Sequence, residues 1–122
     1  MIDEEGSLRV PAVYDSGTQL AVVTTEHFLS SPRVRGFYTL HVDTVNMAAN
    51  DVLELRVYQM VLSGGTARVV YFMSYAGAQG THELIKVSTP IENDLEEANA
   101  LRFSLTQTFG TGRNFPWKVL RS

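Results

Sequence analysis

Residues 52–73, VLELRVYQMVLSGGTARVVYFM, decide the fold class of this 122-residue chain. Apolar and polar residues alternate from Val52 to Tyr58, which is the pattern of a β-strand buried on one face. A second run rich in β-branched and aromatic residues extends from Ala67 to Gly77. Paired glycines between the runs favour a hairpin turn, because glycine readily adopts positive φ angles. The residues of this predicted turn are Ser63, Gly64, Gly65 and Thr66.

Five further runs outside this hairpin have strand patterns. They cover residues 18–29, 36–45, 82–90, 101–108 and 115–122. Gly, Pro, Asn and Asp residues separate them, and no amphipathic helix interrupts the series. Regularly spaced strands with short connections predict an all-β fold, an antiparallel β-sandwich of about seven strands. The pattern leaves a jelly-roll-like and an immunoglobulin-like strand order equally open.

Residues 1–16, MIDEEGSLRVPAVYDS, have no sustained hydrophobic period. They are predicted to form a short N-terminal arm, with the sandwich domain covering residues 17–122. A frayed terminus is the simplest interpretation, and an arm that orders on a partner is the alternative. In the second case the apolar residues that would contact the partner are Leu8, Val10, Val13 and Tyr14.

Composition excludes several functional classes. The formal net charge is -3 and no block of Lys and Arg is present, which disfavours a nucleic acid partner. The absence of cysteine excludes disulfides and thiolate metal sites. No apolar run approaches the ~20 residues that span a bilayer, so no membrane association is expected.

The sequence contains none of the common catalytic or metal-binding motifs. His27, His41 and His82 lie on separate predicted strands or strand ends, with no metal-ligand spacing. Glu92, Asp94, Glu96 and Glu97 form an acidic run of the kind that is usually solvated. The glycine-rich segments lack a phosphate-loop pattern. The chain is therefore predicted to be no enzyme, with no catalytic residue, no cofactor and no metal site.

Apolar residues also occupy the nominally outer face of the predicted hairpin. An exposed apolar patch usually marks an interface, although the fold could instead cover both faces itself. The residues predicted to form an interface with another copy or with a partner protein are Tyr58, Met60, Leu62, Val70 and Phe72. A competing interpretation is an aromatic sugar-binding platform formed by Tyr58, Tyr71, Phe72, Tyr75 and Trp117.

Four segments of the chain resemble small proteins encoded among the structural genes of tailed bacteriophages. These segments are residues 51–56 (DVLELR), 62–66 (LSGGT), 76–80 (AGAQG) and 110–119 (GTGRNFPWKV). The similarity covers roughly residues 17–121 and lies in turns and strands rather than in an active-site motif. The arm, residues 1–16, is longer and more acidic than the group implies.

The resemblance implies a non-enzymatic virion protein at the capsid surface, assembled in the cytoplasm of the bacterial host. The role that it favours is a decoration, or cement, protein that binds the lattice of the major capsid protein, stabilises the head and forms a homo-oligomer, expected to be a trimer. A tail or head-fibre module and a carbohydrate-binding β-sandwich are the alternatives.

Overall fold

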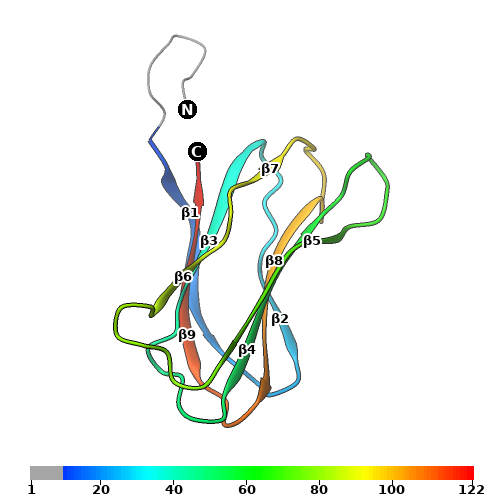
Figure 1. The fold of residues 1–122 in the computed structure, drawn as a ribbon. Coiled ribbons are helices and arrows are strands. Elements are labelled where there is room, and N and C mark those ends of the chain that lie inside the picture. The colour runs from blue at the N-terminus through cyan, green and yellow to red at the C-terminus, as the bar shows by residue number, and fades with distance from the viewer. Residues whose placement is uncertain (1–9) are drawn as a thin grey trace.

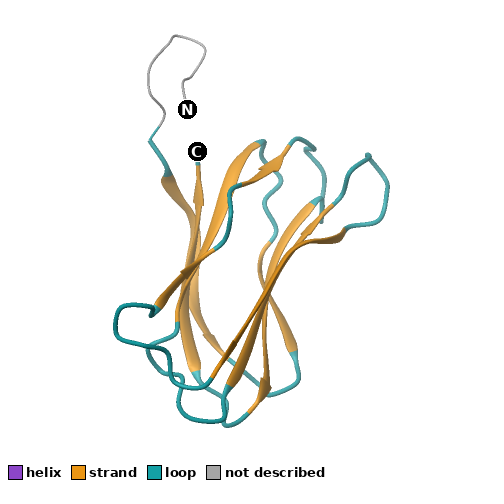
Figure 2. Ribbon diagram, in the orientation of Figure 1, coloured by secondary structure: helices purple, strands orange, loops and turns teal. Residues whose placement is uncertain are grey.

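The computed structural model describes residues 10–122, which form two antiparallel β-sheets packed face to face (Figure 1). This part of the chain contains strands and loops but no helix, so it has no helical segment able to cross a membrane (Figure 2). The prediction of an all-β fold is confirmed. The strands are β1 (Ala12–Leu20), β2 (Glu26–Ser30), β3 (Gly36–Asp43), β4 (Val52–Gln59), β5 (Arg68–Ala76), β6 (Ile85–Val87), β7 (Ile91–Asn93), β8 (Leu101–Phe109) and β9 (Asn114–Arg121).

The strands divide between two sheets, and the chain crosses repeatedly from one sheet to the other. Sheet I has the order β1-β9-β3-β6, and β7 also pairs with β3. Sheet II has the order β2-β8-β4-β5. All pairings are antiparallel. The connections cross between sheets at the two ends of the molecule, so that both ends are built from loops (Figure 1).

The predicted count of seven strands is wrong, because the structure has nine. The expected strand at 18–29 is broken by a turn after Leu20, where Thr24 has a φ of 72°. The acidic run contains the additional short strand β7. The expected arm boundary at residue 16 lies inside β1, since residues 12–16 pair with β9. Most of β1 is exposed, so the strand has no burial alternation that a sequence pattern could reveal.

The core lies between the two sheets and comes mainly from four central strands. Alternating residues of β3, β4 and β8 point inward, as the sequence pattern predicts, and β9 adds Phe115 and Val119. The inward residues of the first three strands are Tyr38, Leu40, Val42, Leu53, Leu55, Val57, Leu101, Phe103 and Leu105, each at most 1% exposed. Burial of these large side chains is the principal stabilising term of the fold.

A buried carboxylate holds the lower end of the sandwich, which includes loops 44–51 and 110–113 (bottom of Figure 1). Asp51 is 1% exposed. Its Oδ2 accepts hydrogen bonds from the Ala48 amide and the Arg113 Nε, both at 2.8 Å. Its Oδ1 accepts one from the Thr111 amide at 3.2 Å. One side chain therefore joins two loops that are about sixty residues apart in the sequence.

A buried amide completes this end. The Gln107 Nε2 donates to the carbonyls of Phe109 and Thr111, at 3.0 and 2.7 Å. Its Oε1 accepts from the Arg113 amide at 3.0 Å. Loop 110–113 is thus fixed at both ends by side chains whose polar atoms are satisfied, as burial requires.

Candidate interaction surface

The outer face of sheet II carries an arginine that lies over two neighbouring aromatic rings. The Arg102 guanidinium, on β8, lies 4.4 Å from the ring centre of Phe28 and 5.2 Å from that of Tyr58. The two rings, on β2 and β4, are 5.8 Å apart. These three strands are neighbours in the sheet, and their outward residues meet because the registers align Tyr58 with Arg102. Such cation–π contacts stabilise and orient an arginine.

A carboxylate under this cluster fixes the tyrosine. The Glu26 Oε2 accepts hydrogen bonds from the Tyr58 hydroxyl and the Ser104 hydroxyl, both at 2.6 Å. Burial raises the pKa of Tyr58, and the bond to Glu26 raises it further. The phenol therefore remains a neutral donor, and its ring is held against Arg102.

A second arginine–aromatic pair lies on the same face. The Arg56 guanidinium is 4.9 Å from the ring centre of Phe72 and forms a 2.8 Å ion pair with Glu54. Phe28 and Phe72 remain 46% and 45% exposed. We call Phe28, Arg56, Tyr58, Phe72 and Arg102 the arginine–aromatic face.

The chemistry of this face suits recognition rather than bond making. Arg and Tyr are enriched at protein interfaces and among the residues that dominate their affinity. The Arg102 Nε is buried and has no hydrogen-bond partner within residues 10–122. Arg102 also forms no ion pair in the described part of the chain. Its guanidinium can therefore pair with an acidic or carbonyl group of a partner.

The five hairpin residues predicted as an interface do not form one patch. Tyr58 and Phe72 lie on the arginine–aromatic face. Val70 lies at a bulge of β5, where the register with β4 shifts, and is 47% exposed. Met60 and Leu62 belong to the loop that follows β4, and Leu62 is 74% exposed.

The predicted turn residues lie in that same loop. Strands β4 and β5 end at Gln59 and begin at Arg68, so residues 60–67 close the hairpin, a longer connection than paired glycines predict. Ser63, Gly64 and Gly65 form its tip, with the Gly65 amide bonded to the Leu62 carbonyl at 2.9 Å, and Thr66 follows. The Glu97 carboxylate accepts from the Gly64 amide at 3.1 Å and from the Ser63 hydroxyl at 3.3 Å.

The predicted arm residues are placed separately. Leu8 lies outside the described residues. Val10 precedes β1 and is 74% exposed. Val13 and Tyr14 lie in β1, and the Tyr14 ring packs edge-on against Tyr38 with 5.4 Å between centres. Tyr14 therefore belongs to the folded domain.

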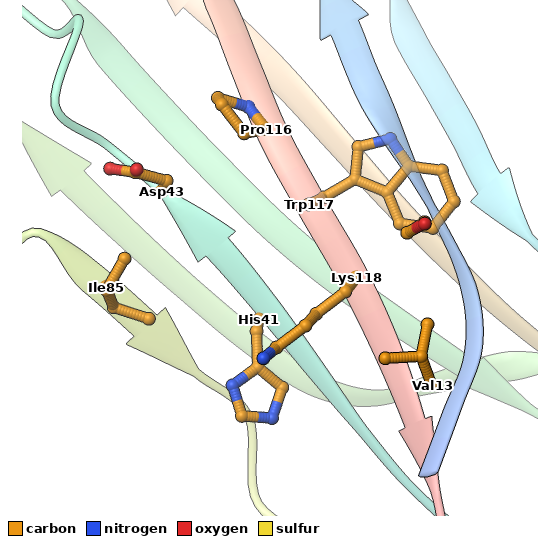
Figure 3. Close-up of a pocket in the computed structure, with 8 residues that line it drawn as sticks. Val13, His41, Asp43, Ile85, Pro116, Trp117 and Lys118 are labelled. Atoms are coloured by element: carbon orange, nitrogen blue, oxygen red, sulfur yellow. The ribbon is translucent and has the colours of Figure 1, made fainter.

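A shallow groove of about 470 Å³ crosses the outer face of sheet I (Figure 3). Val13, Ile85 and Pro116 supply apolar walls, and Lys118 extends from β9 toward His41 on β3. Burial lowers the pKa of His41, and the positive charge of Lys118 lowers it further. His41 is therefore neutral at pH 7, and its Nε2 lies 3.0 Å from the Thr39 hydroxyl oxygen.

Lowering the pH from about 7.5 to about 5 is expected to destabilise the wild type more than a His41→Gln variant. The folded-state pKa of His41 lies below the ordinary histidine value of 6.5, so the unfolded chain binds the proton first as the pH falls. The stability due to neutral His41 is fully present above the unfolded-state pKa of 6.5 and is lost as the pH falls to the folded-state pKa. Urea unfolding at both pH values measures the difference. An identical pH dependence in the two proteins would contradict this assignment.

The residues considered for other chemistries do not converge. Tyr58 and Phe72 lie on the outer face of sheet II, whereas Tyr71, Tyr75 and Trp117 pack against the core, so the five form no common platform. His27 and His41 lie on β2 and β3, and His82 lies in the loop after β5. No group of three His, Cys, Asp or Glu side chains within residues 10–122 is arranged to hold a metal ion.

Three residues of the arginine–aromatic face were not predicted from the sequence. Arg56 and Arg102 occupy polar positions of alternating strands, a signal of outward orientation only. Phe28 lies in a run that was expected to be continuous with β1. Their proximity depends on the strand order β2-β8-β4-β5, which no local pattern specifies.

Comparisons with protein families, with curated proteins and with solved structures find no match to this chain.

Proposed function

We propose that the protein is a non-enzymatic structural component of a tailed-phage virion, a decoration protein that binds the lattice of the major capsid protein and stabilises the head. The observation that carries the proposal is the arginine–aromatic face. It presents two exposed Phe rings and a guanidinium that is already positioned before binding.

Preorganisation is what a capsid-binding surface requires. Arg102 lies over the rings of Phe28 and Tyr58, and Tyr58 is anchored through Glu26, so few rotamers would be lost on docking. Lower ordering entropy raises affinity without new contacts. Modest affinity at each copy would be amplified by binding at many equivalent capsid sites when the protein is oligomeric.

The architecture supports the same role. Each sheet combines strands from both halves of the chain, in the orders β1-β9-β3-β6 and β2-β8-β4-β5. We assign this order to the jelly-roll class of sandwich rather than to the immunoglobulin class, and jelly rolls occur in viral capsid proteins. The assignment concerns architecture, and the role itself depends on the binding surface.

Co-sedimentation with capsids of the phage that carries the gene tests the proposal. Wild-type protein is expected to pellet with capsids, and Arg102→Gln is expected to bind about 30-fold more weakly, as for a residue that dominates an interface. The matched control is Arg35→Gln, because the Arg35 side chain is 68% exposed and, within residues 10–122, forms an ion pair only with the similarly exposed Glu96.

Failure of the wild type to bind capsids would contradict the proposal. Binding to isolated tails instead would favour the tail-module alternative. Equal loss in the Arg35 and Arg102 variants would show that general charge, not the stacked arginine, mediates attachment. The mass of the free protein tests the trimer that the resemblance implies.

A further inference from the structure

Strand β5 is a long unprotected edge of sheet II. It has nine residues, Arg68–Ala76, and in the described part of the chain it pairs with β4 alone. The backbone donors and acceptors on its other side form a row about 30 Å long. Such an edge is a template for pairing with another strand.

The sequence of this edge is apolar and uncharged. Residues 69–81, VVYFMSYAGAQGT, include no charged residue and no proline. Four large side chains of β5 are 42–48% exposed, which places apolar surface on both faces of the strand. They are Val69, Val70, Phe72 and Met73. The alternative that the fold itself covers both faces of this run is therefore not met within residues 10–122.

The other three sheet edges have the features that normally prevent pairing. Strand β1 carries Asp15 at a register shift. Strand β2 has only five residues, includes Glu26 and also shifts register. Strand β6 has three residues and includes Lys86. Charges, irregularities and short length protect an edge, and β5 has only Arg68 at its start and the bulge at Val70.

Strand β6, the neighbouring edge of sheet I, lies close to β5. The Lys86 ammonium is 4.6 Å from the ring centre of Tyr75 on β5. Ile85 and Val87 of β6 are 56% and 49% exposed, and Ile85 lines the groove on the outer face of sheet I. The apolar surface available for pairing at the edge of sheet II is therefore that of β5.

We propose that β5 pairs antiparallel with β5 of a second copy of this chain, which joins the two four-stranded sheets into one. The charge distribution favours a second copy of the chain as the partner. Residues 69–81 carry no charge, so two copies of this segment do not repel each other. In an antiparallel alignment the two Arg68 side chains lie at opposite ends, about 27 Å apart, beyond the ~8 Å over which surface charges interact at physiological ionic strength.

This pairing does not depend on the proposed function. A two-fold contact uses the same surface of both copies and closes at two. It therefore predicts a dimer, in contrast to the trimer that the resemblance implies. The arginine–aromatic face would continue across the joined sheets, with two copies of the Arg102 cluster on one surface.

Light scattering on the purified protein, without capsids, tests the pairing. The wild type is expected to have the mass of a dimer, and Phe72→Glu is expected to be a monomer. Glutamate at this position can pair with Arg56, which now stacks on the Phe72 ring, so the fold is maintained while an acidic charge enters the contact. Phe109→Glu is the matched control. Phe109 is 62% exposed at the lower end of β8, away from β5, so this substitution is expected to leave the dimer intact.

Hydrogen exchange on the wild type gives an independent measurement. Amides of residues 68–76 are expected to exchange faster when dilution dissociates the dimer, because their outer hydrogen bonds are lost. A monomeric or trimeric wild type would overturn the proposal. It would equally be overturned by a Phe72→Glu variant that stays dimeric, or by exchange in β5 that does not change when the dimer dissociates.

Discussion

Replacement of Asp51 by alanine is expected to lower the free energy of unfolding by about 3–5 kcal/mol. The carboxylate is 1% exposed and accepts three hydrogen bonds, from the amides of Ala48 and Thr111 and from the Arg113 guanidinium. Its removal leaves two amides and a partly buried cation without an acceptor. Loops 44–51 and 110–113 would also lose the contact that joins them.

Chemical denaturation measures this loss, with Asp43→Ala as the matched control. Asp43 is half-buried and accepts one hydrogen bond, from the Val45 amide at 3.0 Å. Its removal is expected to cost about 1 kcal/mol or less. Equal destabilisation by the two substitutions would contradict the role assigned to Asp51.

The same carboxylate makes the lower end sensitive to acid. Burial alone would raise the pKa of Asp51, but the hydrogen bonds from Ala48, Arg113 and Thr111 outweigh it, and the pKa lies below 3.8. The stability that follows from this shift is fully present above that value and is lost as the pH falls through the folded-state pKa. Asp51→Ala should therefore be less sensitive than the wild type to acid below about pH 4.

Gly110→Ala is expected to destabilise the protein by about 4 kcal/mol. Gly110 has a φ of 93°, a backbone angle that residues other than glycine rarely adopt. A Cβ at this position would also overlap the Asp51 Oδ1 and lie 2.9 Å from the Asp51 Cα. The neighbouring atoms are a buried carboxylate and backbone, which cannot move without breaking the hydrogen bonds of Asp51.

Gly64→Ala separates backbone strain from this overlap. Gly64 also has a positive φ, 74°, but no atom lies within 4 Å of its ideal Cβ position. Strain alone predicts a loss of about 1–2 kcal/mol there. Thermal or urea unfolding of both variants measures the difference, and similar values would show that the contact with Asp51 is easily accommodated.

Alternation along single strands correctly predicted the core. The pattern of Tyr38, Leu40 and Val42 reflects a strand with one face in the core, and these residues are at most 1% exposed. The pattern failed for β1 because an edge strand exposed on most of its length has no alternation to detect. It also failed for β7, whose three residues are too few to establish a period.

The candidate site was less predictable than the core. Tyr58 and Phe72 were identified because apolar residues at outward positions are conspicuous. Arg102 lies more than forty residues from Tyr58 in the sequence. Phe28 lies on β2, whose neighbour in the sheet, β8, is distant in the sequence. Their stacking follows from strand order and register, which are set by packing of the whole chain. The same holds for Asp51, whose partner Arg113 is sixty-two residues away.

The pairing of β1 with β9 has a consequence for synthesis of the protein. Sheet I has β9 between β1 and β3, so the first strand of the sandwich has no neighbour to bind until the last has been made. During translation β1 must therefore wait with its ladder groups open, and β3 can pair with β6 and β7 on one side only, while sheet II already has β2, β4 and β5 available and lacks only β8. Contacts between distant segments slow folding, and open strands favour aggregation in the interval. The nascent chain can complete sheet I only after β9 leaves the ribosome, so the synthesis of β9 limits the folding of the whole sandwich.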